Sequence, residues 1–135
     1  MGKSYSHKTL TEKLGIKPFS KISILNAPNG FLDSLGNLEN IEIYRDLHGT
    51  VNMIFFFGKS KLVLEVHFKE LKRRILKDGT LWIFWPKATS KIKSDLNENI
   101  IRSVGLEEGL VDVKVISASS DWSGLKFVYR LEDRN

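Results

Sequence analysis

The sequence contains no cysteine, and this absence excludes several kinds of chemistry. Without cysteine the chain has no disulfide, no thiolate nucleophile and no cysteine-ligated zinc site, and it fits a reducing compartment. The histidines, His7, His48 and His67, do not show the spacing of a metal-binding motif. We therefore expect no metal site, and the sequence by itself identifies neither a catalytic residue nor a cofactor.

Long apolar runs are also missing. No run is long enough to span a bilayer, and residues 1–8 are polar and lack the apolar core of a signal peptide. We expect a cytoplasmic protein without a membrane partner. A chain of 135 residues, 41% hydrophobic and 27% charged, is typical of one globular domain. We expect that domain to span residues 1–135, with residues 1–8 as a flexible N-terminal tail.

The net charge of +5 is unevenly distributed. Residues 59–93 contain ten Lys or Arg and three Asp or Glu, whereas the remainder contains eleven basic and thirteen acidic residues. This segment is either a solvated helix face or a surface that faces anions. Under the second interpretation, the candidate nucleic-acid surface consists of Lys69, Lys72, Arg73, Lys77, Lys91 and Lys93.

The stretch Gly79–Lys87 predicts a buried central strand that ends at a proline. Alternation places Trp82 and Phe84 on one of its faces and the neighbouring apolar residues on the other. A helix should precede this strand, capped by Ser60 and running to about residue 76. A second helix should open at Asp95, which forms a capping box with Glu98 and leads to residue 104.

The other elements follow from the same signals. A capping box at Thr9 and Glu12 predicts a very short helix that ends at Gly15. Further strands are expected at residues 21–25, 41–44, 51–57, 110–118 and 125–130, with a short helix at about residues 28–35 and a turn at residues 121–124. In that turn, Gly124 should supply an unusual backbone angle.

Alternating strands and helices predict an α/β fold with right-handed crossovers. The last two strands are joined by a tight turn, so one of them must run antiparallel to the rest. The expected architecture is a three-layer Rossmann-like sandwich, with a mainly parallel sheet and an antiparallel C-terminal hairpin. Such sheets bind ligands beyond the carboxyl ends of the strands.

That edge supplies the candidate ligand-binding residues. Lys87 follows the central strand and can meet a phosphate or carboxylate, while Trp85 is either a stacking surface or a packed side chain. Residues 58–60 lack the spacing of a phosphate-binding loop but open a helix whose N–H groups can face an anion. The complete candidate set is Asn26, Pro28, Gly30, Lys59, Ser60, Trp85 and Lys87.

Asp112 and Lys114 are two residues apart in the strand at residues 110–118, so they should share one of its faces. They form a buried pair that specifies the fold, or they line a pocket. We expect this strand to run parallel to the central strand and close to it. In that arrangement Asp112 pairs with Lys114 or Arg130, and Lys87 is free for a ligand.

From residue 51 onward, the order of elements resembles the later half of a class I methyltransferase. The whole chain, roughly residues 9–130, also resembles a family of short bacterial proteins known as a domain of unknown function. The segments that carry this resemblance are Trp85–Lys87, Gly109–Val115 and Trp122–Val128. The resemblance implies a fold like a truncated class I methyltransferase and implies no particular activity.

The chain departs from that enzyme pattern in three places. Methyltransferases usually place a glycine-rich loop after the first strand, whereas residues 26–30 contain one glycine. They commonly end the second strand with an acidic residue, for which only Glu42 or Asp46 is available. Their next helix–strand–helix segment has no counterpart, because only residues 45–50 separate the second and third strands.

Three hypotheses about function follow from these patterns. The first is a non-catalytic domain that binds a small anionic ligand or a protein partner at the carboxyl ends of the strands. The second is a minimal methyltransferase that uses S-adenosylmethionine. The third is a non-specific nucleic-acid-binding protein that uses the basic segment at residues 59–93. The absent glycine-rich loop favours the first hypothesis over the second.

Overall fold

A six-stranded sheet runs through the computed structural model, which describes residues 8–135. The strand order is β2-β1-β3-β4-β6-β5; the first three neighbouring pairs are parallel and the last two antiparallel. The elements are α1 (Leu10–Leu14), β1 (Lys21–Leu25), α2 (Phe31–Ser34), β2 (Glu42–Tyr44), β3 (Val51–Phe57), α3 (Lys61–Arg73), β4 (Ile75–Pro86), α4 (Glu98–Glu107), β5 (Leu110–Ser117), β6 (Trp122–Tyr129) and a final 3-10 turn (Leu131–Asp133). The predicted fold class is confirmed.

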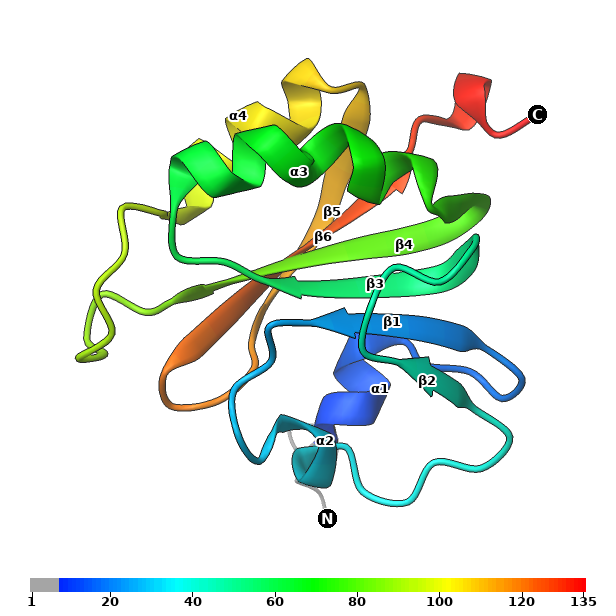
Figure 1. Ribbon diagram of the computed structural model, residues 1–135, viewed down its shortest axis with the longest axis horizontal. Helices are drawn as coiled ribbons and strands as arrows, with labels where there is room; N and C mark the ends of the chain where they lie inside the picture. The colour runs from blue at the N-terminus through cyan, green and yellow to red at the C-terminus, as the bar shows by residue number, and fades with distance from the viewer. Residues whose placement is uncertain (1–7) are drawn as a thin grey trace, which may run out of the picture.

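Helices cover both faces of the sheet, with α3 and α4 on one side and the short α1 and α2 on the other (Figure 1). Each face has its own hydrophobic core. The α3/α4 core includes Leu81, Ile83 and Phe127, whereas the α1/α2 core includes Trp82 and Phe84. Residues 1–7 of the expected tail lie outside the described residues. Within residues 8–135, no helix is both long enough and apolar enough to cross a membrane.

Strand β4 lies inside the sheet between β3 and β6, and its two faces alternate as predicted. The predicted start of the strand is wrong: α3 ends at Arg73 and β4 begins at Ile75. The pairing with β3 then skips four residues of β4, because Val51 pairs with Ile75 and Met53 pairs with Thr80. A Cβ at Gly79 would lie 2.5 Å from the Asn52 carbonyl oxygen, so this glycine permits the close approach of β3.

The predicted cap of the second long helix is wrong. Asn97 caps α4 by accepting from the Ile100 N–H, whereas Asp95 accepts from the Lys61 N–H at the start of α3. The helix also continues through Gly105, where a Cβ would lie 2.1 Å from the Phe127 ring. This glycine therefore lets α4 approach β6. The predicted caps at Thr9 and Ser60 are confirmed.

The C-terminal hairpin differs from the prediction in two ways. Strand β6 begins at Trp122, so Gly124 lies in the strand, where a Cβ would approach the Phe84 ring to 2.7 Å. Close packing, and not a turn angle, requires glycine there. Strand β6 also separates β5 from β4, so β5 is parallel to β4, as expected, but does not adjoin it.

Asp112 and Lys114 lie on opposite faces of β5, contrary to the prediction. The pairing register shifts between them, and the extra residue at position 113 reverses the alternation of side chains. Asp112 accepts from the Arg102 Nε at 2.8 Å on the α4 side, whereas the Lys114 Nζ donates to the Lys13 carbonyl oxygen at 2.9 Å in α1. The predicted pairing with Lys114 or Arg130 is therefore wrong.

Asp112→Ala should lower the free energy of unfolding by about 1 kcal/mol, because its partner Arg102 also pairs with Glu98. Breaking a buried ion pair with no second partner typically costs about 3–5 kcal/mol. Arg102 keeps its contact with Glu98, and both members of the Arg102–Asp112 pair retain a quarter or more of their side-chain exposure. Urea denaturation measures the loss. An unfolding free energy that falls by more than about 3 kcal/mol would show that the remaining contact with Glu98 does not compensate.

Candidate functional site

The carboxyl ends of β1 and β3 meet at the point where the strand order reverses, because β1 lies between β2 and β3. In open α/β sheets this is where ligands bind. Asn26 follows β1 in a left-handed conformation (φ 62°), and Gly30 adopts φ 87° at the start of α2. These angles bend the chain back across the sheet edge and place α2 beside the end of β3.

A cavity of about 270 Å³ opens at this edge, on the α1/α2 face of the sheet. We call it the switch-point cavity. Its apolar wall is aromatic: the Phe31 and Phe57 ring centroids lie 4.8 Å apart, and those of Phe57 and Trp122 lie 5.2 Å apart with nearly perpendicular planes. The lining residues are Pro28, Asn29, Gly30, Phe31, Ser34, Phe57, Ala118, Ser119, Ser120, Asp121 and Trp122.

The rim of the switch-point cavity is polar. Two of its hydroxyls have structural roles, since Ser34 donates to the Phe31 carbonyl and Ser119 accepts from the Trp122 N–H. The exposed side chains of Ser120 and Asp121 have no hydrogen bond or ion pair to residues 8–135. Among the residues that the structure describes, no Lys or Arg lines the cavity.

A second cavity of about 400 Å³ lies at the end of β4 on the opposite face of the sheet. It contains two of the predicted ligand-binding residues, Trp85 and Lys87, together with Lys93. Trp85 is 7% exposed and belongs to the α3/α4 core, so packing accounts for most of its surface. The Lys87 Nζ donates to the Ser117 hydroxyl at 2.5 Å, and no carboxylate lines this cavity among the described residues.

The predicted ligand-binding residues therefore lie in three places. Pro28 and Gly30 line the switch-point cavity, whereas Trp85 and Lys87 line the second cavity. Asn26 lines neither cavity. At the third place, the start of α3, the Lys59 carbonyl accepts from the Ser94 hydroxyl and from the Asp95 N–H, while the Ser60 hydroxyl caps the helix. The Asp95 carboxylate accepts a hydrogen bond from the Lys61 N–H at 2.8 Å. A carboxylate of the chain itself therefore already lies at the N-terminus of α3.

The cations of the candidate nucleic-acid surface form two separate groups. Near the C-terminal end of α3, Lys69 and Lys72 bind Glu108 and Arg73 pairs with Glu70. The Lys77 Nζ belongs to the same group and lies 4.5 Å from the Tyr129 ring centroid. Lys91 and Lys93 lie in the loop after β4, at the other end of the helix (Figure 1).

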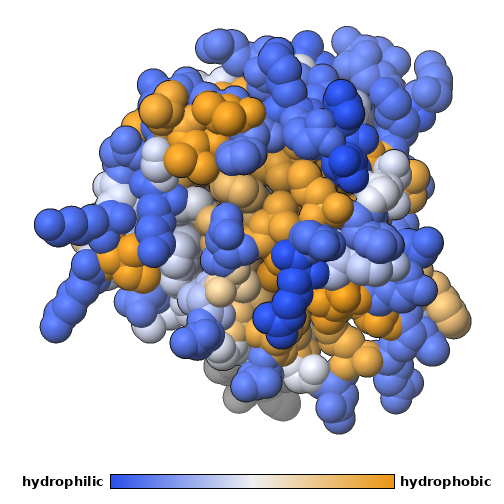
Figure 2. All heavy atoms as spheres, in the orientation of Figure 1, coloured by the Kyte–Doolittle hydropathy of each residue, from blue (hydrophilic) through white to orange (hydrophobic). Residues whose placement is uncertain are grey.

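Apolar side chains interrupt the surface between the two groups. Leu62 and Val66 are 70% and 68% exposed on α3. Figure 2 shows hydrophobic atoms gathered over the first turns of this helix. An apolar patch does not suit a phosphate backbone, so Leu62 and Val66 separate the two basic groups along α3.

The second strand offers no well-placed acidic residue for a cofactor ribose. Glu42 is the first residue of β2, at the amino end, and its carboxylate accepts from the Tyr44 hydroxyl at 2.7 Å. That hydrogen bond raises the pKa of Tyr44. Asp46 lies two residues beyond the carboxyl end. In the part of the chain that the structure describes, no group of three His, Cys, Asp or Glu could hold a metal ion.

The fold is similar to that of solved S-adenosylmethionine-dependent methyltransferases. A TehB-like methyltransferase from Corynebacterium glutamicum superposes with a TM-score of 0.58 at 12% identity, covering 90% of this chain and 88% of that one. The ribosomal protein L11 methylase of Lactobacillus delbrueckii subsp. bulgaricus gives 0.59 at 12% identity, covering 90% and 75%.

A third neighbour was solved with two bound molecules. The O-methyltransferase NcsB1 from neocarzinostatin biosynthesis, solved with S-adenosylmethionine and a hydroxy-methyl naphthoic acid, gives a TM-score of 0.63 at 6% identity. The match covers 94% of this chain and about half (52%) of NcsB1. No family model and no curated protein matches the sequence. At these identities the comparisons show the fold alone.

Of the predicted ligand-binding residues, Pro28 and Gly30 line the switch-point cavity, and the sequence-based prediction does not include its aromatic wall. The sequence predicts a short helix around Phe31, a strand that ends at Phe57 and a turn that includes Trp122, and these predictions do not link the three. These residues come from three distant segments and meet only in the folded sheet. One signal for the aromatic wall was available in the sequence: β3 ends in an aromatic residue, Phe57, at the same edge of the sheet as the loop with Gly30.

Proposed function

We propose that the protein is a small-molecule-binding domain with a methyltransferase-like fold, and that it does not transfer methyl groups. The switch-point cavity carries this proposal, because it combines the ligand-binding position of an open α/β sheet with an aromatic wall and a polar rim. Its volume of about 270 Å³ lies just below the roughly 300–1,000 Å³ of typical ligand sites. It therefore suits a compact ligand.

The lining also defines the chemistry of the ligand. Phe31, Phe57 and Trp122 are packed in the α1/α2 core and are 7%, 3% and 5% exposed, so they form a closely packed wall of the cavity. The small apolar surface that they leave there favours a compact apolar group. Asp121 is the one ionisable side chain among the described lining residues, and its carboxylate favours a cationic or hydrogen-bond-donating group. The proposal thus keeps the expected small ligand at this edge of the sheet. It replaces the expected anion with a cationic or hydrogen-bond-donating ligand, because the cations Lys87 and Lys93 line the other cavity.

Two features of the described chain support the absence of methyl transfer. The loop after β1 leads into an α2 of only four residues, and β2 has three residues with Tyr44 at its carboxyl end. The glycine-rich turn and the acidic ribose contact that the methyltransferase resemblance implies are therefore not reproduced at these positions.

S-adenosylmethionine should consequently bind weakly or not at all. Isothermal titration calorimetry measures this directly, and we expect a dissociation constant well above about 1 μM, that is, a binding free energy weaker than about 8 kcal/mol. A dissociation constant of 1 μM or tighter would favour a minimal methyltransferase over a non-catalytic domain.

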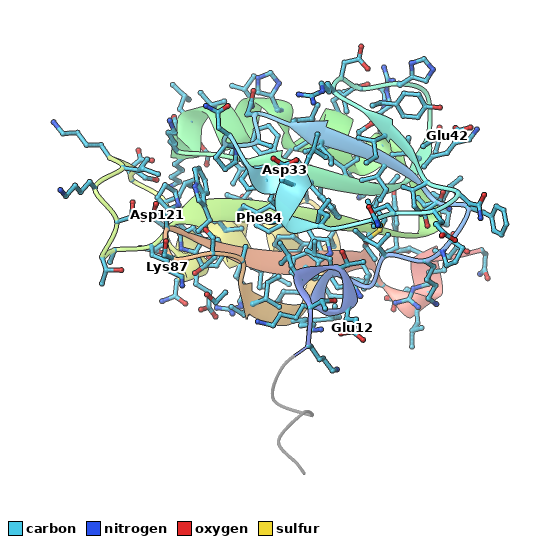
Figure 3. The ribbon with its side chains drawn as sticks, turned by 90° about the horizontal axis from the view of Figure 1, so that it is seen from below. Glu12, Asp33, Glu42, Phe84, Lys87 and Asp121 are labelled. Atoms are coloured by element: carbon cyan, nitrogen blue, oxygen red, sulfur yellow. The ribbon has the colours of Figure 1, made fainter. Side chains whose placement is uncertain are left out.

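The proposed ligand class is tested with two probes that share a body and differ in charge, phenethylamine and 3-phenylpropionate. We expect the amine to bind more tightly, because Asp121 is the charged group at the rim. Asp121→Asn should weaken binding of the amine roughly tenfold, in the range of one charge-assisted hydrogen bond. Asp33→Asn is the matched control, since Asp33 lies on the nearby α2 but does not line the cavity (Figure 3).

Ligand-observed NMR gives the affinities of both probes for the three proteins. Equal weakening by Asp121→Asn and Asp33→Asn would show a general charge effect and not a site. Tighter binding of the carboxylate probe would overturn the proposed ligand chemistry.

A further inference from the structure

A third cavity lies at the opposite edge of the sheet, beside the amino ends of the parallel strands. Its volume is about 380 Å³, and Lys17 and Lys126 supply two cations to it. The lining residues are Gly15, Lys17, Ser20, Asn52, Met53, Asp78, Gly79, Thr80, Lys126 and Val128. This amino-edge cavity is remote from the switch-point cavity, and the two share no lining residue.

Three lysines converge beside the amino-edge cavity. Lys114 pairs with Lys126 across the β5–β6 ladder, and the Lys126 Nζ lies 3.9 Å from where a Cβ would stand on Gly15. Burial, and then repulsion from Lys114 and Lys17, lowers the pKa of Lys126. Among residues 8–135, no carboxylate lies within 4.0 Å of any of these three ammonium groups.

Part of this cluster has a structural explanation. The Lys114 Nζ donates to the Lys13 carbonyl in the last turn of α1, where a cation stabilises a helix end. No such contact exists for Lys126, whose Nζ has no hydrogen-bond partner within residues 8–135. Capping of α1 therefore accounts for Lys114 and leaves Lys126 unexplained.

The rest of the lining is rich in hydrogen-bond donors. The Thr80 hydroxyl is buried and has no partner among residues 8–135. The Asn52 side-chain oxygen accepts from the Lys21 N–H at 2.8 Å, so its amide NH₂ remains as a donor. Asp78 is the one carboxylate among the described lining residues. With Lys17 and Lys126 opposite a single acid, the lining carries a net positive charge.

We propose that the amino-edge cavity binds an oxyanion, a phosphate or phosphate-like group, between Lys126 and Lys17, with Thr80 and Asn52 as further donors. An ammonium group that is half buried beside two others costs free energy while it lacks a counter-ion. A bound dianion removes that cost and satisfies the donors at once. The proposal concerns a site on the opposite edge from the proposed ligand site and does not depend on it.

The bound oxyanion can be free phosphate or the phosphate of a nucleotide, and three probes separate these sources. Inorganic phosphate, AMP and a single-stranded hexanucleotide are titrated into the full chain, and the Lys Cε–H signals are followed by NMR. We expect phosphate to raise the pKa of Lys126, since the anion favours the charged form. Affinity should fall as the pH rises through that pKa, because the neutral amine does not attract the anion.

Two substitutions identify the residues responsible. Lys126→Met keeps the length of the side chain and should weaken phosphate binding roughly tenfold, whereas Asp78→Asn removes the opposing carboxylate and should strengthen it. Lys91→Met is the matched control, because Lys91 is an exposed lysine outside this cavity. It should change the affinity less than about twofold.

The outcomes are distinct. Tighter binding of AMP or of the oligonucleotide than of phosphate would assign the site to nucleotide phosphates, and similar affinities would assign it to the free anion. Equal losses from Lys126→Met and Lys91→Met, or no change in the Lys126 signal at saturating phosphate, would overturn the proposal. If Lys126→Met lowers the melting temperature, the Asp78→Asn variant still tests the proposal. The proposal predicts that this variant binds phosphate more tightly, so unchanged or weaker binding would contradict it.

Discussion

Trp82→Ala should lower the free energy of unfolding by about 3–5 kcal/mol, the range observed when a large buried aromatic side chain is truncated. Trp82 is fully buried in the centre of β4, and its indole lies 5.9 Å from the Phe84 ring, centroid to centroid. Its indole N–H also donates to the Leu14 carbonyl at 3.2 Å and ties α1 to the sheet. The substitution therefore creates a cavity and leaves a buried carbonyl without this donor.

Trp82→Phe separates the two contributions. The ring fills most of the space, so the remaining loss should approach the roughly 1–3 kcal/mol of a buried acceptor left unpaired. Urea denaturation of both variants, followed by tryptophan fluorescence and by circular dichroism, gives the free energies. A loss below about 1.5 kcal/mol for Trp82→Ala would mean that β4 is not the central support of the α1/α2 core.

Gly105→Ala should destabilise the protein, although alanine is the better helix former. In an exposed helix the exchange gains about 1 kcal/mol. Here the new Cβ would lie 2.1 Å from the Phe127 ring, which is fully buried in the α3/α4 core. Helix α4 must move outward or the ring must leave its rotamer, and such overpacking costs about 1–3 kcal/mol. The overpacking cost less the gain in helix propensity leaves a net loss of up to about 2 kcal/mol.

Two further variants test the cause of that loss. Ser103→Ala lies in the same helix on an exposed position and should be neutral or slightly stabilising. Phe127→Leu shortens the opposing side chain, so Gly105→Ala should cost less in that background than in the native protein. If Gly105→Ala raises the melting temperature, the close contact between α4 and β6 is not tight enough to oppose helix propensity.

The fold could be read from the sequence because its main signals are local and agree with one another. The apolar run of β3, the amphipathic pattern of α3 and the alternation in β4 each predict one element, and their order predicts the layers. The helix caps at Thr9 and Ser60 depend on residues only three positions apart. The sequence contains these relationships directly.

The errors have a common physical origin, because each depends on a contact between distant segments. Gly105 and Gly124 resemble a helix stop and a turn residue until Phe127 and Phe84 are placed against them. The one-residue bulge near Val113 carries no sequence signal, yet it moves the following side chains of β5 to the other face.

The candidate site illustrates the same limit. Fold order predicted the carboxyl edge of the sheet, and with it Pro28 and Gly30, but it could not show that one edge holds two cavities on opposite faces. The loop after β1 lies on the α1/α2 face because α2 and the β5–β6 turn are packed there, and these segments are distant in the sequence. The charge of the proposed ligand changed with that assignment, because the nearest lysines line the other cavity.

Backbone chemical-shift mapping tests the central claim most directly. The ¹⁵N-labelled protein is titrated with phenethylamine, and the shifted amides are assigned along the chain. The proposed function predicts shifts at Asn29–Phe31 and Ser119–Trp122, together with the Trp122 indole N–H, because these groups surround the switch-point cavity. Shifts confined to other surfaces, or none at concentrations that saturate a site with a dissociation constant of about 1 mM, would contradict it.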